Sequence, residues 1–235
     1  MLALIDADSY CYAAAAMAEG QSEQVARQNL NQMLEATIIE LNTEEYICFC
    51  TGDTNFRKEI YPEYKANRKD AVKPQFLAAC KEHLRKQWQA FESVGCEADD
   101  LVGIEALRDP TRETIIVSID KDLNTIPGWH FNPRKKERYL VSPRDALRFF
   151  YYQLLVGDAA DNIKGAKGIG PKKAEKILDN AFEEWVESAG TEEELSTFYY
   201  NAVKDYYSCD EELMLNAKCV YIWHKENDEW RPPNA

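Results

Sequence analysis

The chain contains no apolar run that approaches about 18 residues, so we expect no segment that spans a membrane. Its first residues lack a basic stretch and reach an acidic side chain at Asp6, which excludes the pattern of a secretory signal. Only three histidines are present, and none lies near an acidic cluster, which argues against a catalytic triad. The seven cysteines form no C-x-x-C pair and have no histidine at zinc spacing, so we expect reduced thiols and a cytoplasmic protein.

Several enzyme signatures are also missing. The sequence holds no G-x-x-x-x-G-K-[ST], H-E-x-x-H or G-x-S-x-G motif, and no internal repeat, low-complexity tract or obvious linker. The 235 residues are 45% hydrophobic, which supports a folded core. This length suits one sizeable domain with a small appended module.

The net charge of −13 argues at first against a nucleic-acid partner, but the charge is unevenly distributed. Residues 179–235 carry 14 acidic and 4 basic side chains, so the first 178 residues are close to balanced. Two basic strips, 57–69 and 164–176, each hold five Lys or Arg against at most two acids. The strips are either solvated surface or the contacts that hold a polyanion.

Three carboxylates lie within four residues at Glu97, Asp99 and Asp100, just ahead of an apolar, helix-compatible segment. Taken alone, this pattern is typical of a helix N-terminus, where acidic side chains complement the helix dipole. A functional interpretation depends on similar clusters elsewhere in the chain.

Such clusters follow the buried strands that apolar runs predict at residues 2–5, 45–51 and 114–119. These runs are followed by Asp6, by Asp53, and by Asp120 with Asp122. A turn alone would explain the Gly-Asp pair at 52–53. In a parallel sheet, however, the strand ends share one edge, so these carboxylates are expected to converge there.

Two further stretches combine basic residues with other signals. In residues 55–69 aromatic and basic side chains alternate, a mixture that suits phosphate contacts and base stacking. In residues 157–178, Asp158 and Asp161 precede three glycines, Pro171 and a lysine-rich helix start. A glycine loop at a helix N-terminus can turn main-chain N–H groups toward a phosphate, although a purely structural helix-turn-helix shares the pattern.

Taken together, the acidic side chains point to divalent metal ions. So many like charges at one edge cannot remain ionised without cations between them. Oxygen ligands without His or Cys favour Mg²⁺, which Mn²⁺ can replace. Two such ions about 4 Å apart would suit hydrolysis of a phosphodiester.

The chain resembles the 5′-nuclease (flap endonuclease) superfamily, and within it the short 5′→3′ exonucleases of tailed phages. The resemblance rests on LIDAD, TGDTNFRKEIYPEYKANRK, EADD, SIDKDL and GDAADNIKGAKGIGPKKA, which occur in the family order between residues 2 and 178. It implies an α/β, PIN-like 5′-nuclease fold whose mostly parallel central sheet is flanked by helices. A helical helix–three-turn–helix DNA-binding module would follow.

The resemblance also implies roles for individual positions. A first metal site would comprise Asp6, Asp53, Glu97, Asp99 and Asp100, and a second Asp120, Asp122, Asp158 and Asp161. A role for Asp8 as a metal ligand is no better supported than a role as a helix cap. Lys65 and Arg68 would act as catalytic residues that contact the scissile phosphate, and K⁺ would bind at the helix–three-turn–helix element. The DNA contacts would be Arg57, Tyr64, which would stack on the terminal base, Lys164, Lys167, Gly168, Gly170, Lys172 and Lys173.

We therefore expect a nuclease core at 1–156 and a helical module at 157–235, with the DNA-binding element at about 157–180. An arch at about 62–92 would be modest in size, and the connection from Asp53 to Phe56-Arg57 is shorter than in many members. The expected activity is Mg²⁺-dependent hydrolysis of DNA near 5′ ends of duplexes or flaps, and of RNA in RNA–DNA hybrids, by a monomer. The alternatives are a PIN-type ribonuclease and a non-catalytic structure-specific DNA-binding protein.

Overall fold

A six-stranded sheet, with strand order β3-β2-β1-β4-β5-β6, organises the computed structural model, which describes residues 1–233. The elements in chain order are β1 (Leu2–Asp6), α1 (Asp8–Met17), α2 (Glu23–Leu41), β2 (Tyr46–Cys50), α3 (Phe56–Ile60), the 3₁₀ helix η1 (Ala66–Arg68), α4 (Leu77–Gln87), β3 (Phe91–Glu92), α5 (Ala98–Arg108), β4 (Thr114–Val117), the 3₁₀ helix η2 (Asp122–Thr125), β5 (Gly128–Asn132), β6 (Glu137–Val141), α6 (Pro143–Val156), β7 (Gly157–Asp158), β8 (Ile163–Lys164), α7 (Pro171–Glu187), α8 (Leu195–Lys204) and α9 (Asp210–Val220).

The sheet is mostly parallel, as the sequence predicts. Strands β1 to β5 run parallel to their neighbours, and only β6 pairs antiparallel, with β5. All five residues of β1 are buried, because a central parallel strand is covered on both faces. Its apolar run is therefore continuous and does not alternate with polar residues.

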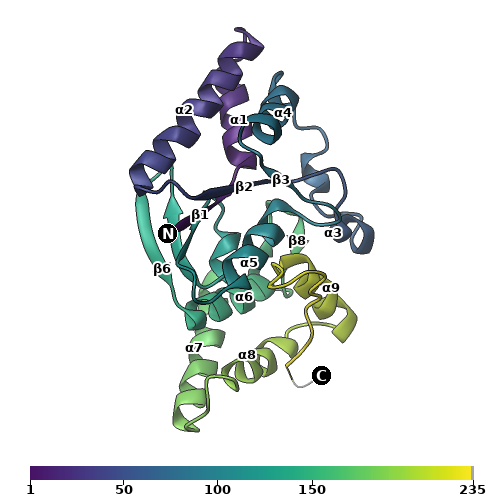
Figure 1. The fold of residues 1–235 in the computed structure, drawn as a ribbon. Coiled ribbons are helices and arrows are strands. Elements are labelled where there is room, and N and C mark those ends of the chain that lie inside the picture. The colour runs from purple at the N-terminus through teal and green to yellow at the C-terminus, as the bar shows by residue number, and fades with distance from the viewer. Residues whose placement is uncertain (234–235) are drawn as a thin grey trace. The chain divides into compact units, whose positions relative to one another are not determined.

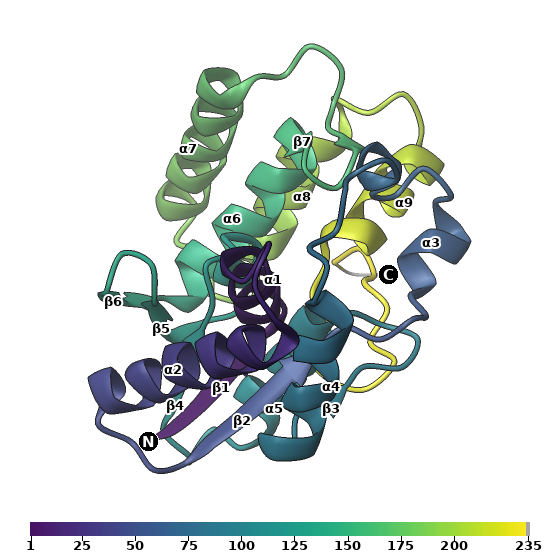
Figure 2. The same ribbon diagram turned by 90° about the horizontal axis from the view of Figure 1, so that it is seen from above.

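Helices cover both faces of the sheet. Alternate residues of β1, Ala3 and Ile5, face a core shared with α1, α2 and α4. Leu2 and Leu4 face the second core, which α5 closes. Figure 1 shows α1, α2 and α4 on one side of the strands and α5 on the other. Figure 2 looks down on the first layer, where α1 and α2 lie side by side over β1.

Local signals explain where the long helices begin and end. Ser22 caps α2 by accepting the N–H of Val25, and Asn42 ends it in the left-handed conformation. Ser142 caps α6 in the same way, with Pro143 as the first helical residue. Helix α7 also starts at a proline and continues to Glu187.

The chain divides into two compact units. The sheet unit comprises Met1–Phe56, Ala71–Val141 and Ile222–Asn227, and the helical unit comprises Arg57–Asp70, Ser142–Tyr221 and the described residues from Asp228 onward. The helical unit has its own core, which includes Tyr64, Tyr151 and Tyr199, with Trp230 at the end of the chain.

These boundaries differ from the predicted division at 156/157. Helix α6 belongs to the helical unit because it packs against α7, α8 and α9. The region predicted as an arch is also divided: residues 62–70 lie in the helical unit, and α4 packs on α1 and α2 of the sheet unit. The last two residues of the predicted module, 234–235, lie outside the described residues. No helix within residues 1–233 is both long enough and apolar enough to cross a membrane.

Candidate active site

The predicted carboxylates of the sheet unit follow strands whose C-terminal ends meet at one edge. Asp6 ends β1, Asp53 lies three residues after β2, and Glu97 follows β3 and precedes α5. Asp120 lies three residues after β4, and Asp122 is the first residue of η2. Because these strands are parallel neighbours, the topology places the acidic residues along one edge of the sheet.

Asp6 lies at the centre of this edge and is 7% exposed. Burial, together with the charges of Asp8 and Asp120, raises the pKa of the Asp6 carboxyl to about 7, and a hydrogen bond from Ser118 opposes the shift. Ser118 Oγ donates to Asp6 at 2.9 Å and accepts the N–H of Asp120 at the same distance. This serine therefore connects the ends of β1 and β4.

Asp8 is held by a lysine of α4. Its Oδ1 atom lies 2.9 Å from Lys81 Nζ, and its Oδ2 atom accepts the N–H of Thr51 at 2.9 Å. Lys81 also donates to the Thr51 carbonyl, and the Thr51 hydroxyl accepts the N–H of Ala98. The resulting hydrogen-bond network joins the ends of β1 and β2 to the start of α5, so Asp8 connects the loops that follow these strands.

The N-terminus of α5 carries the acidic stretch, and the structural interpretation of that stretch is confirmed. Glu97 is the N-cap of α5 and forms a capping box with Asp100, in which each side chain accepts a main-chain N–H of the other residue. Asp99 is half-buried in the first turn. The negative side chains complement the positive end of the helix dipole.

Asp100, a predicted metal ligand, makes hydrogen bonds to main-chain groups in the structure. This side chain is fully buried, and its two oxygens accept the N–H groups of Glu97 at 2.9 Å and Trp223 at 3.2 Å. The physical reason is that a carboxylate at the third helical position reaches back to cap its own helix. Glu97 belongs to the same capping box, so the metal-binding roles of Glu97 and Asp100 both stay predictions.

The donor set fits a hard divalent cation. It consists of carboxylates, the oxygen ligands that such a cation prefers, and burial, followed by the charges of Asp8 and Asp120, raises the pKa of one of them, Asp6. In this arrangement of side chains, no group of three or more His, Cys, Asp or Glu residues among residues 1–233 could hold a metal ion. Metal binding at this edge stays a prediction.

In the helical unit, the segment 57–70 holds the loop that carries Asp158 and Asp161. Asp161 accepts hydrogen bonds from Tyr64 at 2.8 Å and Arg68 at 2.6 Å, and its Oδ2 lies 3.5 Å from Lys65 Nζ. Asp158 is buried and accepts the main-chain N–H groups of Ala160 and Asp161. Both predicted catalytic cations are thus paired with one predicted metal ligand.

Asp158 and Asp161 belong to a different unit from Asp120 and Asp122. The prediction that all four form a second metal site therefore stays a prediction.

Two predicted DNA contacts have other roles in the structure. Arg57 is 2% exposed, and its guanidinium donates to the carbonyls of Cys219 at 2.8 Å and Tyr221 at 2.7 Å, at the end of α9. Tyr64 is 4% exposed in the core of the helical unit, with its hydroxyl on Asp161. A buried guanidinium and a buried ring present no surface to DNA, so these two predictions need correction.

The lysines of the glycine loop are placed differently. Lys164, Lys167, Lys172 and Lys173 are all exposed, between the β7–β8 hairpin and the first turn of α7. Gly168 has a φ of +75°, and Gly170 is the N-cap of α7. The loop therefore presents four ammonium groups beside a helix N-terminus, a site that favours anions.

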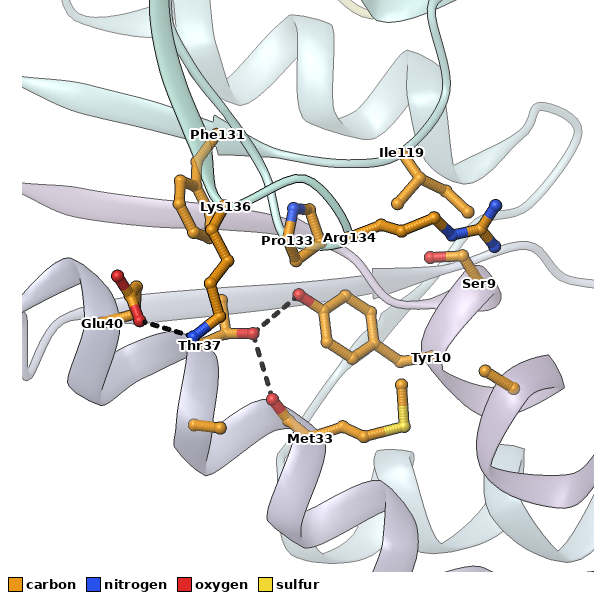
Figure 3. Close-up of a pocket in the computed structure, with 12 residues that line it drawn as sticks. Ser9, Tyr10, Met33, Thr37, Glu40, Ile119, Phe131, Pro133, Arg134 and Lys136 are labelled. Carbon is orange, nitrogen blue, oxygen red and sulfur yellow. Dashed lines mark hydrogen bonds and ion pairs between the residues drawn. The ribbon is translucent and has the colours of Figure 1, made fainter. Parts of the chain in front are cut away.

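A hollow of about 360 Å³ lies beside the acidic edge of the sheet unit, and sequence reasoning did not find it. Ser9 and Ile119, the chain neighbours of Asp8 and Asp120, line it, and Figure 3 shows Arg134 reaching toward Ser9. Lys136 lies 3.3 Å from Glu40 on another wall. The available signal was the basic run Arg134-Lys135-Lys136, which forms the turn between β5 and β6.

The fold and the acidic edge define an α/β protein with a mostly parallel sheet and carboxylates after four of its strands. The profile of the family described as 5′-3′ exonuclease, N-terminal resolvase-like domain, matches residues 1–132. The chain therefore belongs to this 5′-3′ exonuclease family.

Individual relatives agree with this assignment. The flap endonuclease Xni of Shewanella sp. (strain W3-18-1) is 34% identical over 139 residues, which cover 54% of this chain and 53% of that protein. The exonuclease of Escherichia phage T7 is 33% identical over 141 residues, covering 56% and 46%. The chain thus spans about half the length of the curated relatives it matches.

A solved structure extends the likeness in fold. It is the bacteriophage T5 flap endonuclease in a pseudo-enzyme–product complex with DNA and metal ions. The TM-score is 0.67 at 18% identity, over 93% of this chain and 88% of that one. The comparison confirms the predicted 5′-nuclease fold.

Proposed function

We propose that this protein is a structure-dependent 5′→3′ exonuclease and flap endonuclease that hydrolyses DNA phosphodiesters with two Mg²⁺ ions. The observation that carries the proposal is the acidic edge, where carboxylates follow β1, β2, β3 and β4. Family membership and the activities named for the Shewanella, T7 and T5 proteins support the same class of reaction. RNA in RNA–DNA hybrids is a second substrate within this proposal.

In this proposal the acidic edge of the sheet unit holds the first metal through Asp6, Asp53, Glu97 and Asp99. Asp120 and Asp122 contribute to the second, together with Asp158 and Asp161. When bound, such ions act as Lewis acids that activate a water molecule and stabilise charge on the leaving oxygen. Mn²⁺ would substitute for Mg²⁺, because both accept carboxylate oxygens.

The chain's own cations bind and orient the polyanion. Lys65 and Arg68 each contact one carboxylate oxygen of Asp161, so a phosphate that reached this loop would meet two positive side chains. The exposed lysines from Lys164 to Lys173 would hold the backbone of the duplex, in part through the positive end of α7. A K⁺ ion beside the glycine loop is part of the same proposal.

A 5′-labelled duplex and a 5′-flap substrate, incubated with Mg²⁺ or with EDTA, test the activity. We expect short 5′ products with Mg²⁺ alone. Asp120→Asn should abolish cleavage and leave DNA binding in EDTA unchanged, because Asp120 is exposed and the substitution keeps its shape. Arg112→Gln, an exposed change before β4, is the matched control.

Unimpaired cleavage by Asp120→Asn would exclude the second metal site. Binding of the flap without Mg²⁺-dependent cleavage by the unaltered protein would favour a non-catalytic DNA-binding protein. Cleavage confined to single-stranded RNA would favour the PIN-type ribonuclease.

A further inference from the structure

The segment Ile222–Asn227 lies in the sheet unit, although it is far from the rest of that unit in sequence. Ile222 is 4% exposed in the core that α5 closes, beside Ala98 and Val102. The ring of Trp223 stacks on Phe56, with centroids 5.0 Å apart and planes inclined by 17°. This short, irregular piece of chain is therefore anchored by two of its side chains.

Its main chain contacts the acidic edge through Asp100. Trp223 N–H donates to Asp100 Oδ1 at 3.2 Å, and Glu97 N–H donates to Asp100 Oδ2 at 2.9 Å. One fully buried carboxylate thus joins the C-terminal segment to the residue that caps α5.

Helix α5 is shaped to receive the segment. A Cβ atom on Gly103 would lie 2.6 Å from the Trp223 carbonyl oxygen and 2.8 Å from Ile222 Cγ2. Only a residue without a side chain lets the two main chains approach so closely. The contact therefore involves the capping carboxylate, the helix surface and the core at once.

We propose that residues 222–227 are a positioning element of the acidic edge and that Asp100 is a positioning residue rather than a metal ligand. By holding Asp100, the Trp223 N–H fixes the first turn of α5, which carries Glu97 and Asp99. The proposal rests on the proposed function, because it assigns this turn to metal binding. Outer partners that orient metal ligands typically contribute about 10- to 100-fold to metal affinity.

The test separates the main-chain N–H of residue 223 from its ring. Trp223→Pro removes both, whereas Trp223→Ala removes the ring and keeps the N–H. Hydrogen exchange of the amides at 97–101 is measured in metal-free protein, and Mn²⁺ affinity is measured without DNA. We expect faster exchange and about tenfold weaker Mn²⁺ binding for Trp223→Pro, and a clearly smaller effect for Trp223→Ala.

A double-mutant cycle that combines Trp223→Pro with Asp100→Asn tests whether the effect of Trp223 on Mn²⁺ affinity depends on Asp100. If Trp223 acts through Asp100, the double variant binds Mn²⁺ no more weakly than the weaker-binding single variant. The proposal would be overturned if the losses of Mn²⁺ affinity in the two single variants multiplied in the double variant. It would also be overturned if Asp100→Asn abolished Mn²⁺ binding while Trp223→Pro bound Mn²⁺ as Trp223→Ala does, and Asp100 would then be a metal ligand. If the unaltered protein binds no Mn²⁺, the proposed function fails, and the exchange of residues 97–101 still decides whether the segment orders this turn.

Discussion

Replacing Arg57 by methionine should destabilise the protein strongly and leave its DNA contacts intact. The guanidinium is buried and donates to two main-chain carbonyls at the end of α9. A hydrogen bond from a charged group contributes about 1.5–3 kcal/mol, and a buried carbonyl left without a partner costs a similar amount. Methionine retains most of the apolar stem, so the loss of two such bonds should cost about 3–5 kcal/mol.

Urea denaturation followed by circular dichroism measures this loss. With a slope of about 2–3 kcal/mol per molar urea, the midpoint should fall by about 1–2 M. Lys58→Met is the matched control, because the next residue is exposed and its loss should change the free energy of unfolding by at most about 0.5 kcal/mol. DNA affinity of the folded fraction should match the unaltered protein. A normal midpoint combined with weakened DNA binding would refute the structural role and restore the predicted DNA contact.

Three other outcomes follow from the geometry. Gly165→Ala should lower the melting temperature by several degrees, because its Cβ would lie 2.3 Å from the Gly157 nitrogen, whereas Gly170→Ala meets nothing within 4 Å. In EDTA, the free energy of unfolding should fall as the pH rises from about 4 to 7, because folded Asp6, with its pKa raised to about 7, keeps a proton that the unfolded chain releases. Asp6→Asn should flatten this pH dependence, and an unchanged dependence in that variant would contradict the raised pKa. Replacing Lys172 and Lys173 together by glutamine should weaken DNA binding for all sequences and reduce its salt dependence by about two counterions, and an unchanged salt slope would exclude both contacts.

The parts of the fold that depend on local pattern could be predicted from the sequence. The apolar runs at 2–5 and 114–119 became β1 and β4, because a central parallel strand must be apolar on both faces. Ser142 followed by Pro143 marked the start of α6. The placement of Asp6 and Asp120 at one edge needed only the parallel order of their strands.

The roles that depend on distant partners could not be predicted. Arg57 lies in a strip of basic residues that resembles a phosphate contact, but its partners are carbonyls more than 160 positions away. Tyr64 was equally plausible as an exposed stacking ring, and its burial depends on a core built mainly from α6 to α9. The unit boundary moved for the same reason, since α6 follows the sheet in sequence but packs with later helices.

The acidic stretch at 97–100 shows why residue type alone leaves a carboxylate's role open. A metal ion and the N-terminus of a helix both attract carboxylate oxygens, and both occur where a parallel strand leads into a helix. The sequence therefore favours the same residues for either role. Burial separates them: Asp100 is fully buried with both oxygens on main-chain N–H groups, whereas Asp99, one residue earlier, remains half-buried in the first turn. Successive side chains of an α-helix are rotated by about 100° around its axis, so neighbouring acids at one N-terminus are directed to different partners.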